Sequence, residues 1–388
     1  MKNYTIKIIN NISKKALNLL ADNFLIEEEN EPVGILVRSA EMHDYDFSPK
    51  TLYVGRAGAG VNNIPIEKCS EKGIVVCNAP GGNANAVKEL TLMALLLASR
   101  KVVEGIEWTK TLKGQDGIDK LVETGKKEFV GPELYGKKLG VIGLGATGQL
   151  VAETGINMGM QVYGHDPFIS LKNALHLNSK VNYVTEVRDI FKNCDYVTIH
   201  IPKTKDTENF INRELINIAK DGIRIINIAR GGLVDIEALR EALESGKVAK
   251  YIVDFPDKES LELPNTINIP HLGASTPESE ENSAVMVVNE MMEYLSFGNI
   301  KNSVNFPDCD MGVCNSVNRI TVNHRNIPNM IGQITAILAE EGINIANLLN
   351  RHKGDWAYTM IDIDSEVNEG LKEKLNGIDG VVRVRFMK

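Results

Sequence analysis

The chain has 388 residues, of which 43% are hydrophobic and 24% charged, and its formal net charge at pH 7 is −8. These proportions are typical of globular proteins and exclude a mainly disordered chain, and the length allows two or three domains. The net negative charge argues against a nucleic-acid or anionic-membrane surface, so small molecules and other protein chains are the expected partners.

The cysteines and the apolar runs indicate where the protein resides. Five cysteines are scattered along the chain, and no histidine stands at metal-ligand spacing from them. An odd number of scattered cysteines is typical of free thiols in a reducing compartment. The N-terminal residues lack an apolar signal core, and the longest apolar run, 92–98, is too short to cross a bilayer. The sequence therefore predicts a cytoplasmic protein without a metal site or a membrane contact.

The first part of the chain alternates apolar runs with helical stretches. Residues 5–9 and 33–37 predict strands, and 13–20 predict a helix between them. Arg38 directly follows the second strand, and ligands of open α/β sheets bind at the carboxyl ends of the strands. Arg38 is therefore a candidate anion contact, with an ordinary surface arginine as the alternative.

Two glycine-rich loops follow in the same lobe. The strand 52–54 leads into Gly-Arg-Ala-Gly-Ala-Gly-Val at 55–61, and the strand 74–77 leads into 78–83 and then into a long apolar helix. Glycine lets the backbone approach a small ligand closely, and a helix N-terminus can hold a carboxylate. The pattern predicts a small α/β lobe with several loops at one place, followed at 105–125 by a polar connector that contains an exposed helix.

The most informative motif lies at 139–166. A short apolar strand enters Gly-Leu-Gly-Ala-Thr-Gly at 143–148, a helix follows, and a second strand ends at Asp166. This is a dinucleotide-binding fingerprint in its required context, with the phosphates expected at the helix N-terminus. Asp166 would accept from the adenosine ribose hydroxyls and would repel a 2′-phosphate, which favours NAD over NADP. The predicted cofactor residues are Gly143, Gly145, Ala146, Thr147, Gly148 and Asp166, and the alternative is a glycine-rich turn without a ligand.

The pattern of strand and helix continues to the linker. Further strands are predicted at 196–200, 223–228, 251–254 and 265–269. Apolar strands that alternate with helices predict a doubly wound parallel sheet. A long amphipathic helix at 277–295 and a linker within 297–316 follow.

The last seventy residues repeat the pattern on a smaller scale. Their order of elements, βαββαβ, predicts a ferredoxin-like domain. The whole chain is therefore expected to be an α/β protein with two Rossmann-like or flavodoxin-like lobes and this C-terminal domain. The expected divisions are a substrate-binding lobe at 1–95 completed by about 280–305, a nucleotide-binding domain at 96–279, a linker at 306–316 and the C-terminal domain at 317–388.

Two residues at later strand ends supply the chemistry that a nicotinamide enzyme needs. Arg230 can direct two N–H groups onto the carboxylate and carbonyl oxygens of a 2-oxo acid. His271 can give a proton to the forming alkoxide and take it back in the oxidative direction. A carboxylate would orient the histidine, and Asp254, Asp257 and Glu259 precede it. The alternative for Arg230 is a buried structural arginine.

These motifs resemble those of the D-isomer-specific 2-hydroxyacid dehydrogenases. The resemblance includes Asn-Ile-Ala-Arg-Gly-Gly-Leu-Val-Asp at 227–235, Pro-His-Leu-Gly-Ala-Ser-Thr at 270–276, Val-Arg-Ser-Ala at 37–40, the 55–61 loop and the fingerprint. Within the family the chain is most similar to the phosphoglycerate branch. The resemblance implies NAD-dependent oxidation of D-3-phosphoglycerate to 3-phosphohydroxypyruvate, the first step of L-serine biosynthesis, by a homo-oligomer. The alternatives are another D-2-hydroxyacid dehydrogenase, acting on glyoxylate or hydroxypyruvate, and a non-catalytic NAD-sensing corepressor.

The resemblance also implies residue roles. Arg230 would bind the substrate, His271 would be the acid–base, and Arg56 would hold the phosphate. The cofactor cleft would also include Pro202, Ile228, Ala229 and Asp254, and the substrate site would include Arg38, Gly58 and Asn83.

The segment 254–259 departs from the family pattern of Asp-Val-Phe, two residues and Glu-Pro, because it reads Asp-Phe-Pro-Asp-Lys-Glu. An ungapped count places Glu259 on the catalytic glutamate, whereas alignment of the aromatic residues shifts the count by one. A histidine without a carboxylate partner therefore remains an alternative.

The C-terminal domain resembles an ACT domain, a small-molecule sensor of amino-acid biosynthetic enzymes. The loops at 324–328 and 342–346 are similar to those that hold serine, which implies His324, Asn326 and Asn344 as effector residues. Where many ACT domains have Pro-Gly, this chain has Pro-Asn at 328–329, and asparagine tolerates the left-handed conformation. The alternative is a domain retained only for oligomerisation.

Overall fold

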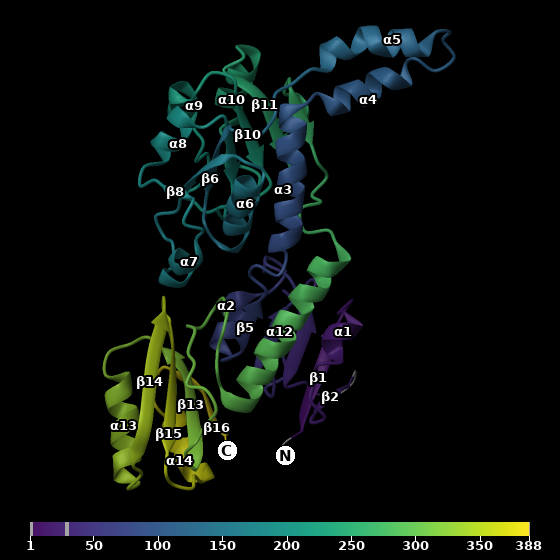
Figure 1. Cartoon of the computed structure of the whole chain (residues 1–388). Coiled ribbons are helices and arrows are strands. Elements are labelled where there is room, and N and C mark those ends of the chain that lie inside the picture. Colours follow the sequence, from purple (N-terminus) through teal and green to yellow (C-terminus); the bar gives the residue numbers. More distant parts are fainter. Residues whose placement is uncertain (1–2, 28–30, 388) are drawn as a thin grey trace. The chain divides into compact units, whose positions relative to one another are not determined.

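The computed structural model describes residues 3–27 and 31–387. The chain divides into two compact units, and each is described by itself. Unit 1 contains Met1–Asn83 and Pro277–Lys388, and unit 2 contains Ala84–Thr276. Figure 1 labels the elements of both units along the chain.

Unit 1 begins with a five-stranded parallel sheet in the order β2-β1-β3-β4-β5. Its elements are β1 (Tyr4–Ile9), α1 (Lys14–Leu17), β2 (Phe24–Ile26), β3 (Gly34–Val37), β4 (Tyr53–Arg56), α2 (Ile66–Glu71) and β5 (Val75–Asn78). The strands predicted at 5–9, 33–37, 52–54 and 74–77 are confirmed, but the helix predicted at 13–20 is only four residues long. β2, a three-residue edge strand with one buried side chain, was not predicted, because so short a strand has little apolar pattern.

The long helix predicted at 277–295 is confirmed as α12 (Pro277–Phe297). Its buried face, which includes Val287 and Met291, joins the core of the first sheet. The strands carry glycine beneath the helix, because a Cβ at Gly34 would lie 2.8 Å from Met291 Sδ and one at Gly55 would lie 3.1 Å from Val287 Cβ. The helix therefore belongs to the first sheet although nearly two hundred residues separate them in sequence.

Unit 2 contains a seven-stranded parallel sheet in the order β12-β11-β10-β9-β6-β7-β8, as the doubly wound pattern predicts. Its strands are β6 (Lys138–Ile142), β7 (Gln161–His165), β8 (Asn182–Tyr183), β9 (Tyr196–Ile199), β10 (Ile223–Asn227), β11 (Val248–Val253) and β12 (Thr266–Asn268). Its helices are α3 (Ala84–Ser99), α6 (Ala146–Asn157), α7 (Leu171–His176), α8 (Val187–Asn193), α9 (Arg213–Ile218), α10 (Ile236–Glu244) and α11 (Lys258–Leu261). The strand order reverses between β6 and β9, which is where ligands bind in such sheets.

The connector predicted at 105–125 with one exposed helix forms two helices instead, α4 (Val102–Lys110) and α5 (Ile118–Gly125), followed by the 3-10 turn η1 (Lys126–Phe129). Trp108 of α4 packs on Phe129 with ring centroids 5.3 Å apart. No residue of either helix is buried, and Ile106 is 50% exposed. The pair is therefore held together by its own contacts and presents apolar side chains to solvent.

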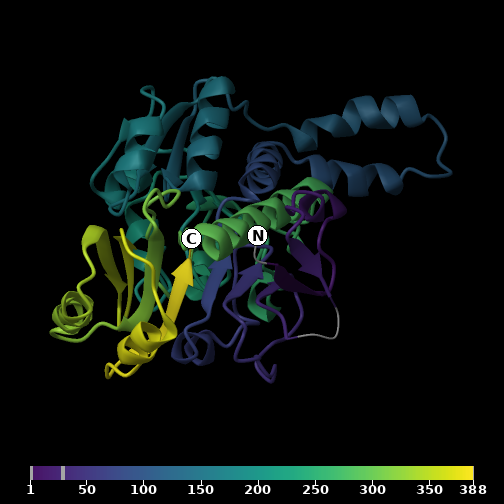
Figure 2. The same cartoon turned by 90° about the horizontal axis from the view of Figure 1, so that it is seen from below.

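The C-terminal residues of unit 1 form the predicted βαββαβ domain. Its elements are β13 (Asn318–Arg325), α13 (Met330–Glu340), β14 (Ile345–Lys353), β15 (Trp356–Ile363), α14 (Glu369–Asn376) and β16 (Val381–Met387). The antiparallel sheet has the order β14-β15-β13-β16, and Figure 2 shows both helices on one of its faces. The helices bury Ile334, Leu338, Leu371 and Leu375 against that face. The ferredoxin-like prediction is confirmed.

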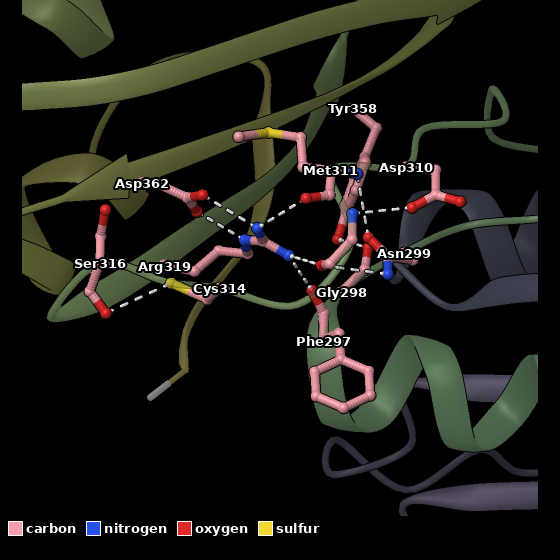
Figure 3. Close-up of polar contacts among 11 residues, drawn as sticks. Phe297, Gly298, Asn299, Asp310, Met311, Cys314, Ser316, Arg319, Tyr358 and Asp362 are labelled. Carbon is pink, nitrogen blue, oxygen red and sulfur yellow. Dashed lines mark hydrogen bonds and ion pairs between the residues drawn. The ribbon is translucent and has the colours of Figure 1, made fainter.

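Arg319 of β13 connects this domain to the end of α12 (Figure 3). The guanidinium is fully buried, and its Nε and Nη2 donate to the Asp362 carboxylate at 2.6 and 2.9 Å. Its Nη1 donates to the carbonyl oxygens of Phe297 at 2.8 Å and Gly312 at 2.6 Å. Phe297 ends α12, so the cation satisfies a carbonyl that has no partner within the helix. One buried side chain thus links the sheet, the helix end and the linker.

Replacing Arg319 with methionine is expected to lower the free energy of unfolding by about 3–5 kcal/mol, because it leaves the Asp362 charge buried without a partner. The double variant Arg319→Met/Asp362→Leu should recover most of that loss. Chemical denaturation followed by circular dichroism measures both. The exposed pair of Arg213 and Glu241 is the control, and Arg213→Met should cost less than about 1 kcal/mol. Equal losses in the two single variants would contradict this account.

Glu290 of α12 is predicted to make stability depend on pH. It is 7% exposed, its Oε1 accepts from Asn302 Nδ2 at 2.6 Å, and burial raises its pKa from 4.5 to about 8. Between these values the folded chain keeps a proton that the unfolded chain has lost, so stability should fall as pH rises from about 4.5 to 8. Glu290→Gln should reduce that fall, whereas the exposed control Glu153→Gln should not. Denaturation at pH 5.5 and 8.5 tests this, and an unchanged fall in Glu290→Gln would refute it.

Candidate active site

The turn after β6 contains three glycines. The fold requires glycine at two of these positions, and the third faces open space. Gly143 has φ +91°, and a Cβ there would lie 2.5 Å from the His200 carbonyl oxygen. A Cβ at Gly148 would lie 1.8 Å from the Gly143 carbonyl oxygen. A Cβ at Gly145 would meet nothing within 4 Å. Gly145 precedes α6 without a side-chain cap, so the N–H groups of Ala146 and Thr147 can bind a pyrophosphate beside it.

This difference gives a paired prediction. Gly145→Ala should fold normally, because its φ of −70° suits alanine and the space is open, but it should weaken NADH binding by about tenfold or more. Gly148→Ala should instead be strongly destabilised, because its methyl group overlaps the Gly143 backbone. Thermal unfolding and NADH fluorescence titration measure the two effects. Full NADH affinity in a folded Gly145→Ala variant would exclude a pyrophosphate at this turn.

Asp166 directly follows β7 and braces the glycine turn. Its Oδ2 accepts from the backbone N–H of Leu144 at 2.9 Å, and its Oδ1 accepts from that of Phe168 at 2.9 Å. Each carboxylate oxygen can accept a second hydrogen bond, which leaves room for the ribose hydroxyls of a nucleotide. The residues of the fingerprint therefore fit a dinucleotide as the sequence predicts.

The same edge of the sheet carries the other predicted cofactor residues. Pro202 follows β9, and Ile228 and Ala229 follow β10, so they lie at the carboxyl ends of neighbouring strands. His200, which the sequence analysis did not select, donates its backbone N–H to the Ile142 carbonyl oxygen at 2.7 Å. Burial lowers the pKa of His200 to about 4, so its ring is neutral at physiological pH.

Arg230 stands on a turn that Asn227 holds. Asn227 is 1% exposed, its Oδ1 accepts from the backbone N–H of Ala229 at 3.2 Å, and its Nδ2 donates to the Arg230 carbonyl oxygen at 2.8 Å. The Arg230 side chain is exposed, which excludes the buried structural arginine. Asn227 was not predicted as a functional residue, although its place at the end of β10, three residues before Arg230, is the signal in the sequence that could have identified it.

Phe255 brings Arg230 and His271 together. The Phe255 and His271 ring centroids are 4.4 Å apart, and Arg230 Cζ lies 5.5 Å from the Phe255 centroid. His271 has φ +53°, an uncommon value for a residue other than glycine, and such conformations concentrate at functional sites. In the sequence Phe255 stands out only as a departure from the family pattern, and its contacts with both side chains are visible only in the structure.

Asp254 is the carboxylate that lies against the His271 loop. It is fully buried, and its two oxygens accept from the backbone N–H groups of Leu272 at 2.7 Å and Gly273 at 2.8 Å. Burial raises its pKa, while these hydrogen bonds and the charge of His271 oppose the rise. Glu259 lies in α11 with an exposed side chain, and within the described residues no hydrogen bond joins it to His271. The partner role of Glu259 stays a prediction.

In unit 1 the structure brings together three of the four predicted substrate residues. Arg38 follows β3 and Arg56 ends β4, and these strands are neighbours with Val37 opposite Arg56. Arg38 forms an ion pair with Glu280 of α12. A Cβ at Gly58 would lie 1.8 Å from Arg56 Nη1, so only glycine leaves room for the arginine there. Asn83 is partly buried, and it is the last residue of the first segment of unit 1.

The predicted effector residues differ in their exposure to solvent. His324 is 2% exposed, its Nδ1 lies 2.7 Å from the Arg325 carbonyl oxygen and its Nε2 lies 2.8 Å from Thr359 Oγ1. Both ring nitrogens are thus already bonded, and burial lowers the pKa of His324. Asn326 and Asn344 are exposed. Asn329 has φ +63°, the left-handed conformation expected for the Pro-Asn sequence.

The part of the chain that the structure describes contains neither a metal-ligand cluster nor a membrane-spanning helix. No three histidine, cysteine, aspartate or glutamate side chains are placed to hold a metal ion there. Within the same residues, no helix has both the length and the apolar character needed to span a membrane.

Known proteins resemble this chain over most of its length. The D-3-phosphoglycerate dehydrogenase of Methanocaldococcus jannaschii is 34% identical over 87% of this chain, which spans 63% of that protein, less than two thirds of its length. The D-3-phosphoglycerate dehydrogenase of Haemophilus influenzae is 31% identical over 90% of this chain and 84% of its own length. The NAD+-bound 3-phosphoglycerate dehydrogenase structure from Entamoeba histolytica superposes with a TM-score of 0.59 at 26% identity, covering 78% of this chain and 99% of that one.

A match to a family model adds to these similarities and identifies the family of the chain. Residues 92–273 match the model described as D-isomer specific 2-hydroxyacid dehydrogenase, NAD binding domain. That range contains the glycine turn, Asp166, Arg230 and His271. The chain belongs to the D-isomer-specific 2-hydroxyacid dehydrogenase family, and its cofactor is NAD.

Proposed function

We propose that the chain catalyses the NAD-dependent oxidation of D-3-phosphoglycerate to 3-phosphohydroxypyruvate, the first step of L-serine biosynthesis. The observation that carries the proposal is the group of Arg230, Phe255 and His271 at the carboxyl edge of the NAD-binding sheet. The names of the relatives from Methanocaldococcus and Haemophilus support this choice of substrate within the family.

In this mechanism the residues of unit 2 divide the work. The fingerprint turn and Asp166 would hold NAD, whose nicotinamide would accept the hydride. Arg230 binds the substrate carboxylate with its forked N–H groups and keeps the C2 hydroxyl in place. His271 takes the proton of that hydroxyl as the hydride leaves C2. Asp254 holds the backbone that follows His271 through Leu272 and Gly273, and Phe255 restricts the positions of both catalytic side chains.

The residues of unit 1 have proposed roles in binding. Arg56 is the proposed phosphate ligand, with Arg38, Gly58 and Asn83 as further substrate contacts. Close packing of Arg56 on Gly58 supports a preformed position for its guanidinium. The proposed domains are the substrate-binding lobe at 1–95 completed by about 280–305, the NAD domain at 96–279, the linker at 306–316 and an ACT regulatory domain at 317–388.

Regulation, assembly and location are also proposals. L-serine is the proposed effector of the ACT domain, through His324, Asn326 and Asn344. The exposed apolar side chains of α4 and α5 support assembly into a homo-oligomer, because such a surface is commonly covered by a partner. The proposed location is the cytoplasm, which the five free cysteines favour.

An NADH-linked assay across a panel of 2-oxo acids, with and without L-serine, tests substrate and regulation together. The highest kcat/KM is expected with 3-phosphohydroxypyruvate. A kcat/KM about a hundredfold higher with glyoxylate or another unphosphorylated acid would replace the proposed substrate. No turnover on any 2-oxo acid, together with normal NADH binding, would favour the non-catalytic NAD sensor.

A further inference from the structure

A cavity of about 730 Å³ lies within unit 1, outside the residues assigned to catalysis or to serine. It is formed by β14, by the end of β5 and by the segment that follows α12. The residues that line it are Asn78, Pro80, Asn302, Ser303, Val304, Pro307, Asp308, Asn350, Arg351, His352 and Lys353. Its volume is in the range of sites for small-molecule ligands.

The charge of this cavity is mainly positive. β14 contributes Arg351, His352 and Lys353 in succession, and of the described residues that line the cavity only Asp308 is acidic. Lys353 Nζ donates to the Ser303 carbonyl oxygen at 2.7 Å, which fixes this end of β14 against the segment after α12. The Arg351 and His352 side chains are exposed, and neither forms a hydrogen bond or an ion pair within the described chain. Arg351 lies on the same face of β14 as Lys353, so its donors are available to a ligand in the cavity, whereas the His352 side chain lies on the opposite face.

Asparagine residues make up part of the remaining lining. Asn350 lines the cavity, and its Oδ1 accepts from Thr359 Oγ1 at 2.8 Å, which fixes its amide group. Asn302 is held in place because its Nδ2 donates to Glu290. Asn78 Nδ2 donates to the Ala59 carbonyl oxygen at 2.5 Å, so the wall of the cavity also contacts the loop at 55–61.

We propose that this cavity binds a small anion with carboxylate or phosphate groups and at least two negative charges. Arg351 would pair with one anionic group through its forked N–H donors, and Lys353, on the same face of β14, would add a second positive charge. The charges favour an anion, because the guanidinium of Arg351 and the ammonium of Lys353 outnumber Asp308, the one acid among the described residues that line the cavity. A bound anion would bridge β14 to the segment at 302–308 and to Asn78.

Trp356 provides a local reporter of binding. The sequence has two tryptophans, so Trp108→Phe leaves Trp356 as the remaining one. Trp356 is 6% exposed, stands opposite Lys353 in the β14–β15 ladder and packs on Phe306 with ring centroids 5.7 Å apart. Phe306 precedes the lining residue Pro307, so a ligand that moves either wall should alter the emission of Trp356.

The experiment titrates the full-length Trp108→Phe protein with inorganic phosphate and with citrate, and compares each with sodium chloride at equal ionic strength. A saturable change in Trp356 emission is expected with at least one of the two anions. A response to phosphate alone identifies a phosphate site, and a response to citrate alone identifies a carboxylate site. Arg351→Ala in the same background should weaken binding by about tenfold or more, and Arg351→Lys should weaken it less.

The matched control is Arg188→Ala, which removes an exposed arginine of unit 2. It should leave the titration unchanged. Since Arg351 lines this cavity and Trp356 packs on Phe306 beside its wall, the result does not depend on the catalytic proposal. An emission change no larger than that with sodium chloride would overturn the anion site. Unchanged affinity in Arg351→Ala would do so as well.

Discussion

Replacing Arg230 with alanine is expected to lower kcat/KM for 3-phosphohydroxypyruvate by about 10²- to 10³-fold, the usual cost of removing one partner of a charge-assisted pair. The fold should be unaffected, because the Arg230 side chain is exposed and Asn227 holds the turn through backbone groups. Steady-state kinetics and thermal unfolding measure the two quantities.

Two further variants sharpen the test of Arg230. Arg230→Lys keeps the charge but loses the forked donors, so its activity should fall between those of the wild type and Arg230→Ala. Arg213→Ala removes another exposed arginine of unit 2 and should retain full activity. If Arg230→Ala keeps the wild-type kcat/KM, Arg230 does not bind the substrate.

Replacing His271 with asparagine is expected to lower kcat by about 10²- to 10⁴-fold, the usual contribution of a general acid–base. Asparagine is the informative substitution because His271 has φ +53°, and asparagine adopts this left-handed conformation more readily than alanine. The loop and its hydrogen bonds to Asp254 should therefore persist, and NADH should bind with unchanged affinity.

The pH profile of kcat separates proton transfer from a structural role of His271. The limb of the profile that reports its protonation should disappear in His271→Asn. A variant with lower kcat and an otherwise unchanged profile would assign the proton transfer to another group. Glu259→Gln tests the predicted carboxylate partner in the same assay: a shifted limb supports Glu259, and an unshifted limb leaves Asp254 as the carboxylate beside this loop.

Local chemistry made much of the cofactor site predictable. The turn at 143–148 depends on backbone conformations and close approaches that glycine alone permits, and these are visible in the order of residues. Alternation of apolar strands with helices likewise predicted the doubly wound sheet and the C-terminal βαββαβ order. Short edge strands such as β2 and β8 escaped because two or three residues carry too little pattern.

The contacts of Phe255 with Arg230 and His271 could not be predicted from local sequence patterns. Arg230 and His271 are forty-one residues apart, and their common contact with one ring depends on β10, β11 and β12 lying side by side. From the sequence, the carboxylate partner of His271 can be sought only by counting residues along the segment 254–259. In the structure, burial and hydrogen bonds place Asp254 against the His271 loop. The surroundings of His324 could not be predicted from the sequence either. Both of its ring nitrogens contact oxygen atoms, of Arg325 and of Thr359, because of its place in the sheet.

By itself the sequence determined the fold class, the dinucleotide motif and the identity of the candidate catalytic residues, because each rests on local spacing and on side-chain chemistry. Only the tertiary structure decided that Phe255 lies beside both Arg230 and His271, that Arg319 closes the end of α12, and that Arg351 lines a cavity. Each of these depends on contacts between segments far apart in the chain, whose partners are set by packing and burial and not by the order of residues.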